Sequence, residues 1–304
     1  MDPQQRLLLE LAFEAHQVPR QMPSATAVVI GAGYNDFARA VDFGPEFGSL
    51  VDPNVYTGAG GYLGVLSGRI SFMLDLHGPC MNIDTSCSSG IMAVHVARRE
   101  EFALCGAAFL TLLPFGHAQL ARAGMLSPKG RCYTFDSRAD GFAKGEALGM
   151  LRMEAAHGPG DIRNSAARQD GRSASLTAPN GTAQVDLLHT LAANSARHEA
   201  HGTGTLLGDP IEVAALARHG GRKSLSSVKA NAGHAEPCAG LTGLLAAANG
   251  KVCFHHRLIH YQLKGNPRTV SRCSRQQEPE SHGKVNTHLL HASTPKDDGS
   301  AARI

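Results

Sequence analysis

The sequence predicts an α/β fold, because segments of strand length alternate with segments of helical periodicity along its 304 residues. Apolar residues make up 42% of the chain and charged residues 18%, which is typical of a folded globular protein. A chain of this length can form one large domain or two half-domains. We expect two halves, at residues 1–156 and 157–292, followed by a disordered tail at residues 293–304.

The first half is expected to begin with a helix and a buried strand. Asp2 suits a helix N-cap and Pro3 suits the first helical position, and leucines follow at helical spacing. Residues 27–31 (AVVIG) predict a short buried strand. Residues 62–74 are mostly apolar and predict a second helix.

The remaining predicted elements continue the alternation. A helix is expected to open at Ile91, after the next strand. The other predicted strands are short apolar runs, and the other predicted helices combine an apolar face with a capping signal at one end. The strands are expected at residues 81–85, 104–113, 147–153 and 224–229, and the helices at residues 184–193, 209–217 and 237–248.

Composition and charge exclude several classes of function. The formal net charge of +3 is small and evenly spread, so we expect no binding to nucleic acid or to an anionic membrane surface. No apolar run reaches the roughly 18 residues of a membrane span, and the first residues carry no targeting signal, so a cytoplasmic protein is expected. The seven cysteines include no CxxC pair and are expected to be free thiols.

Cys87 is the candidate nucleophile. It lies between the strand predicted at residues 81–85 and the helix that Ile91 opens. A sulfur at the first turn of a helix meets unpaired N–H groups and the positive end of the helix dipole. These favour a thiolate and can hold the oxyanion of a tetrahedral thioester intermediate. The alternative is a buried structural cysteine before a helix capped by Ser88 and Ser89, and the local pattern leaves both open.

A second cluster surrounds His201. Three glycines at positions 202, 204 and 208 let the backbone bend tightly, and they would hold His201 on a rigid loop beside the hydroxyls of Thr203 and Thr205. Glu212 stands three residues after Asp209, where a capping-box partner belongs. The plainer alternative for His201 is a turn histidine that hydrogen-bonds to the backbone.

A third cluster contains Lys229 and His234. Lys229 is expected to end a strand, and His234 follows five residues later, just before a helix. A lysine near a histidine can keep the imidazole neutral, so that the ring donates a hydrogen bond instead of carrying charge. The plainer alternative is a surface lysine and a capping histidine.

A cysteine followed by two histidine-bearing loops indicates acyl transfer. These residues lie far apart in the sequence and show no HExxH-type spacing, so no metal site is expected. A cysteine hydrolase that uses Cys87 with His201 is a less favoured interpretation of the same residues.

Several longer motifs occur in a fixed order. They are residues 2–10 (DPQQRLLLE), 84–89 (DTSCSS), 124–128 (GMLSP), 130–136 (GRCYTFD), 139–142 (ADGF), 169–173 (QDGRS), 176–181 (LTAPNG), 201–212 (HGTGTLLGDPIE) and 229–234 (KANAGH). With these motifs the chain resembles the ketosynthase domain of polyketide synthases, which belongs to the thiolase-fold condensing enzymes, the β-ketoacyl synthases. The resemblance covers the chain to about residue 267.

The resemblance implies a thiolase-like fold, with two related α/β halves in an α-β-α-β-α arrangement that is incomplete here. It also implies a decarboxylative Claisen condensation. Cys87 would take an acyl chain from an acyl carrier protein, and His201 and His234 would stabilise the enolate formed when the malonyl-carrier protein loses CO2. Attack of this enolate on the Cys87 thioester would give a β-ketoacyl product.

The same resemblance implies supporting roles. Lys229 would act on the histidines electrostatically, and Glu212 would be a buried structural acid. Thr203 and Thr205 match positions that hydrogen-bond the phosphopantetheine arm of the carrier, and Asn286 matches the end of a glycine-rich loop that gates the site. No bound cofactor is implied, since the substrates travel on the phosphopantetheine of the acyl carrier protein.

The chain departs from the family pattern in several places, including a short stretch at residues 96–103. The apolar strand expected before Gln169 is nearly absent, residues 194–198 leave almost no room for a strand before His201, and residues 281–288 only loosely match the gating loop. These departures allow an alternative, a catalytically impaired ketosynthase-like fragment that acts only in dimerisation or carrier docking. Family members pair through the strand before the nucleophile, here about residues 81–85, so a homodimer is expected.

Overall fold

The computed structural model describes residues 1–17, 20–33, 35–42, 56–155, 162–175, 177–191, 197–220 and 224–249. In chain order the elements are α1 (Pro3–Gln17), β1 (Ala27–Gly31), α2 (Asp36–Asp42), α3 (Thr57–Gly61), α4 (Val65–Leu74), β2 (Cys80–Ile83), α5 (Ser89–Ala97), β3 (Phe102–Phe109), α6 (Pro114–Arg122), β4 (Ala147–Glu154), α7 (Gly181–Leu191), β5 (Arg197–Glu199), α8 (Gly208–His219), β6 (Ser224–Ser226), α9 (Lys229–Ala232), the 3-10 helix η1 (Glu236–Cys238) and α10 (Ala239–Asn249).

The larger sheet has the strand order β2-β1-β3-β4, with β4 antiparallel to β3 and the other neighbours parallel. Every residue of β1 is buried, as expected for a central strand covered on both faces. Val28 and Ile30 pack into one apolar cluster with residues of α1 and α4, whereas Ala27 and Val29 pack into another with residues of α5 and α10. Successive side chains of β1 therefore point to opposite faces of the sheet and contribute to both apolar clusters.

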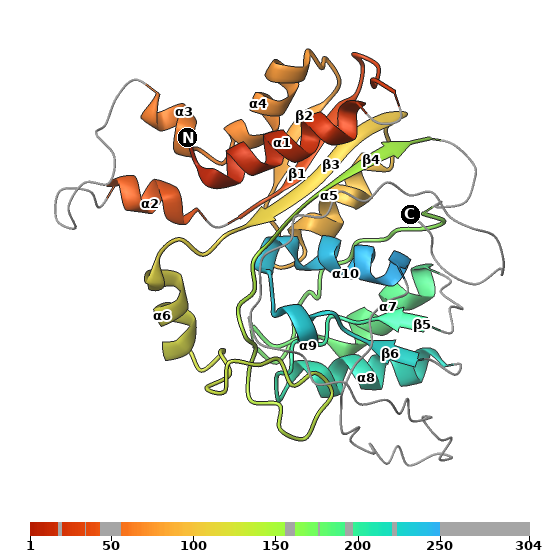
Figure 1. Ribbon diagram of the computed structural model, residues 1–304. Helices are drawn as coiled ribbons and strands as arrows, with labels where there is room; N and C mark the ends of the chain where they lie inside the picture. Colours follow the sequence, from red (N-terminus) through yellow and green to blue (C-terminus); the bar gives the residue numbers. More distant parts are fainter. Residues whose placement is uncertain are drawn as a thin grey trace.

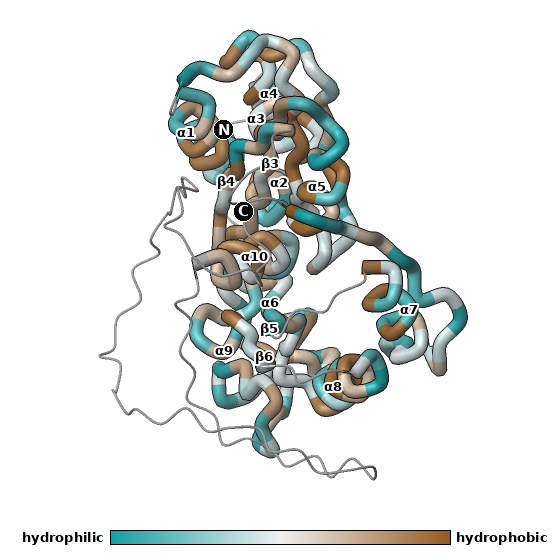
Figure 2. Tube along the Cα trace, turned by 90° about the vertical axis from the view of Figure 1, so that its right-hand side faces the viewer, coloured by the Kyte–Doolittle hydropathy of each residue, from teal (hydrophilic) through white to brown (hydrophobic). Residues whose placement is uncertain are grey.

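A second, two-stranded sheet pairs β5 with β6 in parallel. Figure 1 shows α1 and α4 on one side of the larger sheet, α5 and α10 between the two sheets, and α8 beyond β5 and β6. Figure 2 shows hydrophobic stretches on α5 and α10, at the interior between the two sheets. The expected α/β fold with alternating helix and sheet layers is confirmed, and its second sheet is short.

Most predicted elements are confirmed, with ends shifted by a few residues. The apolar run over residues 104–113 was expected as a single strand, but β3 ends at Phe109. The backbone N–H groups of Leu112 and Leu113 instead donate to Oδ2 of the buried Asp36, at 2.9 Å each, and α6 begins at Pro114. Asp36 belongs to α2, a helix that the sequence pattern did not predict.

Two expectations about the second sheet were wrong. Lys229 does not end a strand: β6 ends at Ser226, and Lys229 is the first residue of α9. The chain leaves the sheet because the Val228 N–H donates to Oε1 of Glu199, at 2.5 Å, and the Ala230 N–H donates to the Ser227 carbonyl. A strand before His201 does exist, as the three residues of β5.

The expected absence of a strand before Gln169 holds for the described residues 162–175, which contain neither helix nor strand. Asn286, the loop at residues 281–288 and the tail at residues 293–304 lie outside the part of the chain that the structure describes. Among the described helices, none is long and apolar enough to cross a bilayer.

Candidate active site

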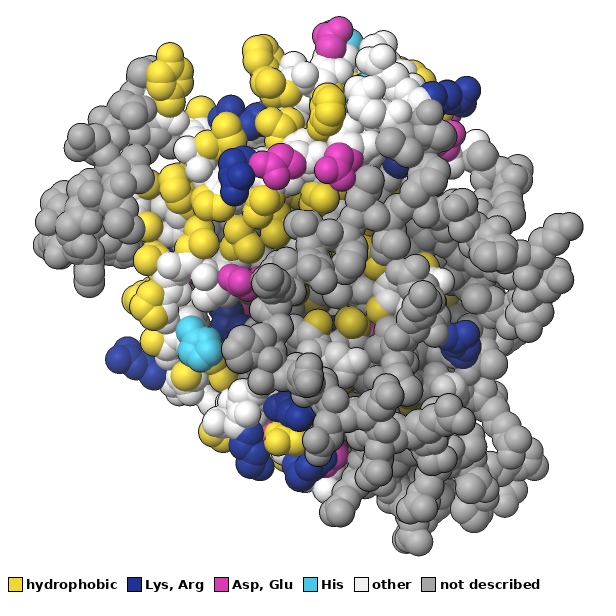
Figure 3. Space-filling view, in the orientation of Figure 1, with side chains coloured by type: hydrophobic (Ala, Val, Ile, Leu, Met, Phe, Trp, Pro, Cys, Tyr) yellow, Lys and Arg dark blue, Asp and Glu magenta, His cyan; other side chains and the backbone are white. Residues whose placement is uncertain are grey.

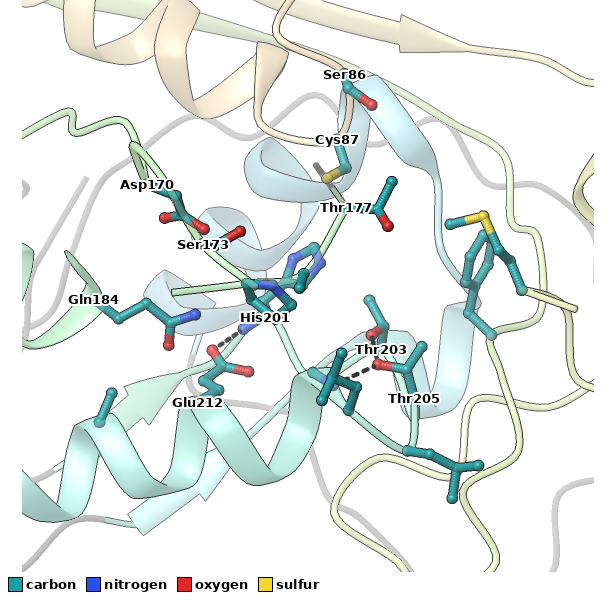
Figure 4. A pocket seen from close by; sticks show the side chains of 18 of the residues that line it. Ser86, Cys87, Asp170, Ser173, Thr177, Gln184, His201, Thr203, Thr205 and Glu212 are labelled. Carbon is teal, nitrogen blue, oxygen red and sulfur yellow. Dashed lines mark hydrogen bonds between the residues drawn. The ribbon is translucent and has the colours of Figure 1, made fainter. Parts of the chain in front are cut away.

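Cys87 projects from the tight turn that joins β2 to α5 (Figure 4). Ser86, just before it, has φ 58°, a left-handed conformation that is uncommon outside glycine. The turn is held locally, since the Ser86 N–H donates to Oδ1 of Asp84 at 2.9 Å and the Thr85 N–H donates to Oγ of Ser89 at 2.9 Å. The strained turn lifts the Cys87 side chain into a cavity.

Three side chains converge in this cavity from distant parts of the chain. The sulfur of Cys87 and one ring nitrogen each of His201 and His234 lie within 4.8 Å of one another. The two imidazole rings are 5.5 Å apart between centroids and nearly perpendicular, at 87°. His201 lies between β5 and α8, and His234 follows α9. The fold therefore brings together the candidate nucleophile and both histidines that the sequence singled out.

The loop that carries His201 is held by Glu212. Its Oε1 accepts the His201 N–H at 2.6 Å, and its Oε2 accepts the Gly202 N–H at 2.8 Å. Gly202 has φ 43°, and a Cβ there would lie 2.6 Å from Cγ2 of Thr134, so only glycine fits. The capping-box expectation for Glu212 was wrong, because its carboxylate reaches past the start of α8 to this loop instead.

Asp209 is a supporting residue whose role the sequence did not show. Its side chain is 2% exposed and lies inside α8, not at its N-cap. Oδ2 accepts the Phe135 N–H at 2.7 Å, and Oδ1 accepts the Gly204 N–H at 3.1 Å. Asp209 thus ties the glycine-rich loop to residues 130–136, another of the family-like motifs. No local sequence pattern indicates this role, because one of the two partners, Phe135, lies 74 residues away in the sequence.

Lys229 lies buried beneath the site, with 4% of its side chain exposed. Burial lowers the pKa of its ammonium, while the carboxylates of Glu212 and Glu199 raise it. Glu199 also holds the backbone just before Lys229, since it accepts hydrogen bonds from the Ser226 hydroxyl and the Val228 N–H. The expectation of a surface lysine does not apply here.

Both histidines are neutral at physiological pH. Burial, followed by the charge of Lys229, lowers the pKa of His201 to about 4, although its ring is exposed to the cavity. Burial lowers the pKa of His234 to about 2, with further contributions from His201, Lys229 and Lys144. Neutral rings can donate hydrogen bonds to an oxygen without first losing a proton.

The thiol of Cys87 does not match the expected thiolate. Burial raises its pKa, and the positive charge of Lys229 offsets only part of that effect. Cys87 lies two residues before the first residue of α5, and the Ser88 and Ser89 N–H groups next to it already donate to the Thr85 and Ser86 carbonyls. The resting sulfur is therefore protonated, and a base must remove its proton when it reacts.

His234 is fixed in one tautomer by the backbone. Its Nδ1 accepts a hydrogen bond from the Glu236 N–H at 3.1 Å, so in the neutral ring the proton lies on Nε2. A histidine that binds a metal through Nε2 instead donates from its other nitrogen. The Cys87, His201 and His234 cluster has a suitable set of atoms for a soft divalent cation, but this tautomer makes His234 a donor and not a ligand.

Threonines and leucines line the cavity, whose volume is about 1380 Å³. Thr203 and Thr205 lie on one wall, with their hydroxyl oxygens 3.2 Å apart, and Asp170 and Ser173 lie across from them (Figure 4). The apolar part of the wall comes from α6, α7 and α8, and it includes Leu120, Leu187, Leu188, Leu191, Leu207 and Leu216. A polar arm and an apolar chain can both be accommodated.

Glu212 gives a stability prediction. Glu212→Ala leaves the N–H groups of His201 and Gly202 without their carboxylate acceptor, so we expect the free energy of unfolding to fall by about 1–3 kcal/mol. Chemical denaturation measures this change. The matched control is Glu14→Ala, at an exposed position of α1, for which we expect a change within about 0.5 kcal/mol. Equal effects of the two substitutions would contradict the role of Glu212.

His234 gives a pH prediction. Its pKa is about 2 in the folded protein, below the usual 6.5, so between these values only the unfolded state binds the proton. Stability is therefore lost as the pH falls below about 6.5, by up to about 1.4 kcal/mol per pH unit from this group. Denaturation curves at pH 7, 6 and 5 should show a steeper loss for the wild type than for His234→Asn. Parallel pH profiles would contradict the buried neutral histidine.

Comparisons with known families match nearly the whole described chain. Residues 1–157 match the model of the β-ketoacyl synthase N-terminal domain, and residues 160–265 match that of the C-terminal domain. One subunit of the phenolphthiocerol/phthiocerol polyketide synthase of Mycobacterium tuberculosis is 41% identical over 277 residues, which cover 81% of this chain and 18% of the relative. Another subunit of the same synthase is 38% identical over 289 residues, which cover 83% and 15%.

Solved structures agree with these matches. A ketosynthase from module 6 of the bacillaene synthase of Bacillus subtilis 168 superposes with a TM-score of 0.71 at 30% identity, covering 84% of this chain and 48% of that one. An oxazolomycin ketosynthase domain from Streptomyces albus JA3453 gives 0.69 at 28% identity, covering 80% and 47%. The chain thus spans about half of these ketosynthases and less than a fifth of the curated relatives.

Proposed function

Because the chain belongs to the β-ketoacyl synthase family, we propose that it is a polyketide ketosynthase that condenses a Cys87-bound acyl chain with malonyl-acyl carrier protein. The observation that carries the proposal is the convergence of Cys87, His201 and His234 within 4.8 Å, with both rings neutral. Residues 1–156 supply the nucleophile and residues 157–292 supply the histidines, so the site forms between the two proposed halves.

In the first step Cys87 acquires the acyl chain. Its sulfur loses a proton to the imidazole of His201, since both nitrogens of His234 are already occupied, and attacks the thioester carbonyl of the acyl-carrier protein. The C–S bond to the carrier breaks, and the departing phosphopantetheine thiolate takes up the proton. Because burial favours the thiol form of Cys87, this proton transfer accompanies substrate binding and does not precede it.

In the second step malonyl-carrier protein loses CO2. The carbon–carbon bond breaks, and its electron pair forms an enolate whose oxygen is the atom that gains charge. The Nε2–H of His234 and an N–H of His201 donate to that oxygen, which places stabilisation where charge develops. The enolate carbon then attacks the Cys87 thioester, expelling the sulfur as a thiolate that is reprotonated, and the β-ketoacyl chain leaves on the carrier.

The carrier and its arm are assigned from the cavity. Thr203 and Thr205 line the cavity, and their hydroxyls would hydrogen-bond a phosphopantetheine arm. Asn286, which lies outside the described residues, is proposed to bind substrate from the gating loop. Figure 3 shows Lys and Arg side chains gathered in the lower part of the view, over the loop between α6 and β4. Lys129 and Arg138 of this loop pair with Asp140 and Asp136, but the two cations are about half exposed and the two carboxylates are only 25% and 0% exposed. The loop also lines the cavity, so its cationic side chains would attract an acidic face of a carrier protein.

A homodimer is proposed through β2. The sheet order places β2 at an edge, with β1 as its only partner among the described strands. A free edge next to a catalytic turn favours pairing with another strand. We expect sedimentation equilibrium to give twice the 32.0 kDa chain mass. A single species of 32.0 kDa at all concentrations would contradict pairing through β2.

The proposal is tested with acyl- and malonyl-carrier protein. We expect three products: an acyl adduct on Cys87, CO2, and a β-ketoacyl carrier. Release of free acid without malonyl donor would indicate a cysteine hydrolase. If a cerulenin-like electrophile labels Cys87 no faster than the other six cysteines, and no product forms, the chain acts only in docking or dimerisation.

A further inference from the structure

A partly buried ion pair lies next to His234. Nζ of Lys144 is 3.0 Å from Oε1 of Glu236, and the two side chains are only 7% and 20% exposed. Nζ also lies 5.0 Å from the centroid of the Phe109 ring, so the lysine packs against an apolar surface. Removing two charges from water costs several kcal/mol per ion before their attraction is counted. None of the proposed reaction steps uses either residue.

Both members of the pair are tied to His234 through the backbone. The His234 N–H donates to the Ala143 carbonyl at 2.7 Å, and the Gly145 N–H donates to the His234 carbonyl at 2.9 Å, so Lys144 sits opposite His234 in a two-bond bridge. On the other side, the Glu236 N–H donates to Nδ1 of His234 at 3.1 Å. The ion pair therefore closes a ring of contacts around the histidine.

Glu236 holds its N–H in place at a cost. Its φ is 38°, in the left-handed region where a residue with a Cβ is disfavoured by about 1–2 kcal/mol. A residue without restraint there would relax toward negative φ, and the direction of its N–H would change. The charge of Lys144 lies 3.0 Å from Oε1 of Glu236, outside hydrogen-bond geometry, and attracts the Glu236 side chain to the side of the bridge, which opposes that relaxation.

We propose that Lys144 and Glu236 are positioning residues that hold His234 in its Nε2–H tautomer. The ion pair keeps the Glu236 N–H on Nδ1, so the ring always offers Nε2–H to the oxygen of the substrate. The importance of this tautomer for catalysis rests on the proposed function, whereas the tautomer itself does not. The charges agree with the role, because Lys144 contributes to the low pKa of His234.

The direct test is the 15N NMR spectrum of protein labelled on histidine. Among the 16 histidines, the His234 signals are assigned by their loss in His234→Asn. We expect the wild type to show Nε2 protonated and Nδ1 unprotonated. Lys144→Met keeps most of the unbranched apolar stem but removes the charge, and we expect it to give a mixture of tautomers. Lys144→Arg keeps the charge and should restore the single form.

Activity provides a second readout. In decarboxylation of malonyl-carrier protein, we expect Lys144→Met to lower kcat by about 10–100-fold with little change in KM, and Lys144→Arg to recover most of the loss. Arg6→Met is the matched control, since it breaks an exposed ion pair of 3.1 Å on α1 and should change neither readout. Glu236→Gly removes the carboxylate but accepts positive φ, so it should keep the tautomer better than Glu236→Ala.

An unchanged His234 spectrum in both Lys144→Met and Glu236→Ala would overturn the proposal. The proposal would also be overturned if Lys144→Met lowers kcat and Lys144→Arg does not restore it, although both variants melt at the wild-type temperature. If Lys144→Met fails to fold, Glu236→Ala decides the question, because it removes the same ion pair from the other side and an unchanged His234 spectrum in it would overturn the proposal. If the wild type shows no decarboxylation, the proposed function fails, but the NMR spectra still test the positioning role.

Discussion

Cys87→Ala should abolish condensation while leaving decarboxylation of malonyl-carrier protein measurable. Condensation requires an acyl thioester on the sulfur, so its rate should fall by at least about 10⁴-fold. Decarboxylation requires only hydrogen bonds to the developing enolate oxygen, and these come from His201 and His234. Intact-protein mass spectrometry should show the acyl adduct on the wild type and none on the variant, and CO2 release measures the second activity.

The matched control is Cys80→Ala. Cys80 is exposed and does not line the cavity, so this variant should keep both activities and the acyl adduct. An acyl adduct that persists in Cys87→Ala would place the nucleophile on another residue. Loss of both activities in Cys87→Ala would mean that the sulfur also takes part in decarboxylation, contrary to the separation of the two steps.

His234→Ala should lower kcat for decarboxylation by about 10²–10³-fold, the usual effect of removing one donor from an oxyanion site. The residue is 4% exposed, and its ring is held by the Glu236 N–H and by Phe142, whose ring centroid lies 5.0 Å away, so the donor is fixed in the cavity before substrate binds. His234→Asn should lose less, because an amide N–H can still donate. Steady-state CO2 release measures both variants.

The control for this series is His117→Ala. His117 is exposed on α6 and does not line the cavity, so its loss should leave CO2 release unchanged. A decarboxylation rate in His234→Ala within a factor of three of the wild type would remove His234 from the oxyanion site and leave His201 as its only imidazole donor.

Local sequence signals were sufficient for elements whose apolar periodicity agrees with their caps. α1 begins at Pro3 as the Asp2-Pro3 pair indicates, and β1 matches the apolar run over residues 27–31. These local signals failed where a side chain distant in sequence accepts hydrogen bonds from the backbone, so that the strand ends earlier than its apolar run. Asp36 ends β3 early, and Glu199 turns the chain out of β6 before Lys229.

The sequence by itself determined the family and singled out the candidate reacting groups, because the motif around Cys87 and those that carry His201, Lys229 and His234 are contiguous. Only the tertiary structure decided their states. Desolvation depends on what packs around a group, so burial keeps Cys87 as a thiol and both histidines neutral. For the same reason the spacing of Glu212 predicted a helix cap, whereas the fold gave its carboxylate two better donors on the His201 loop.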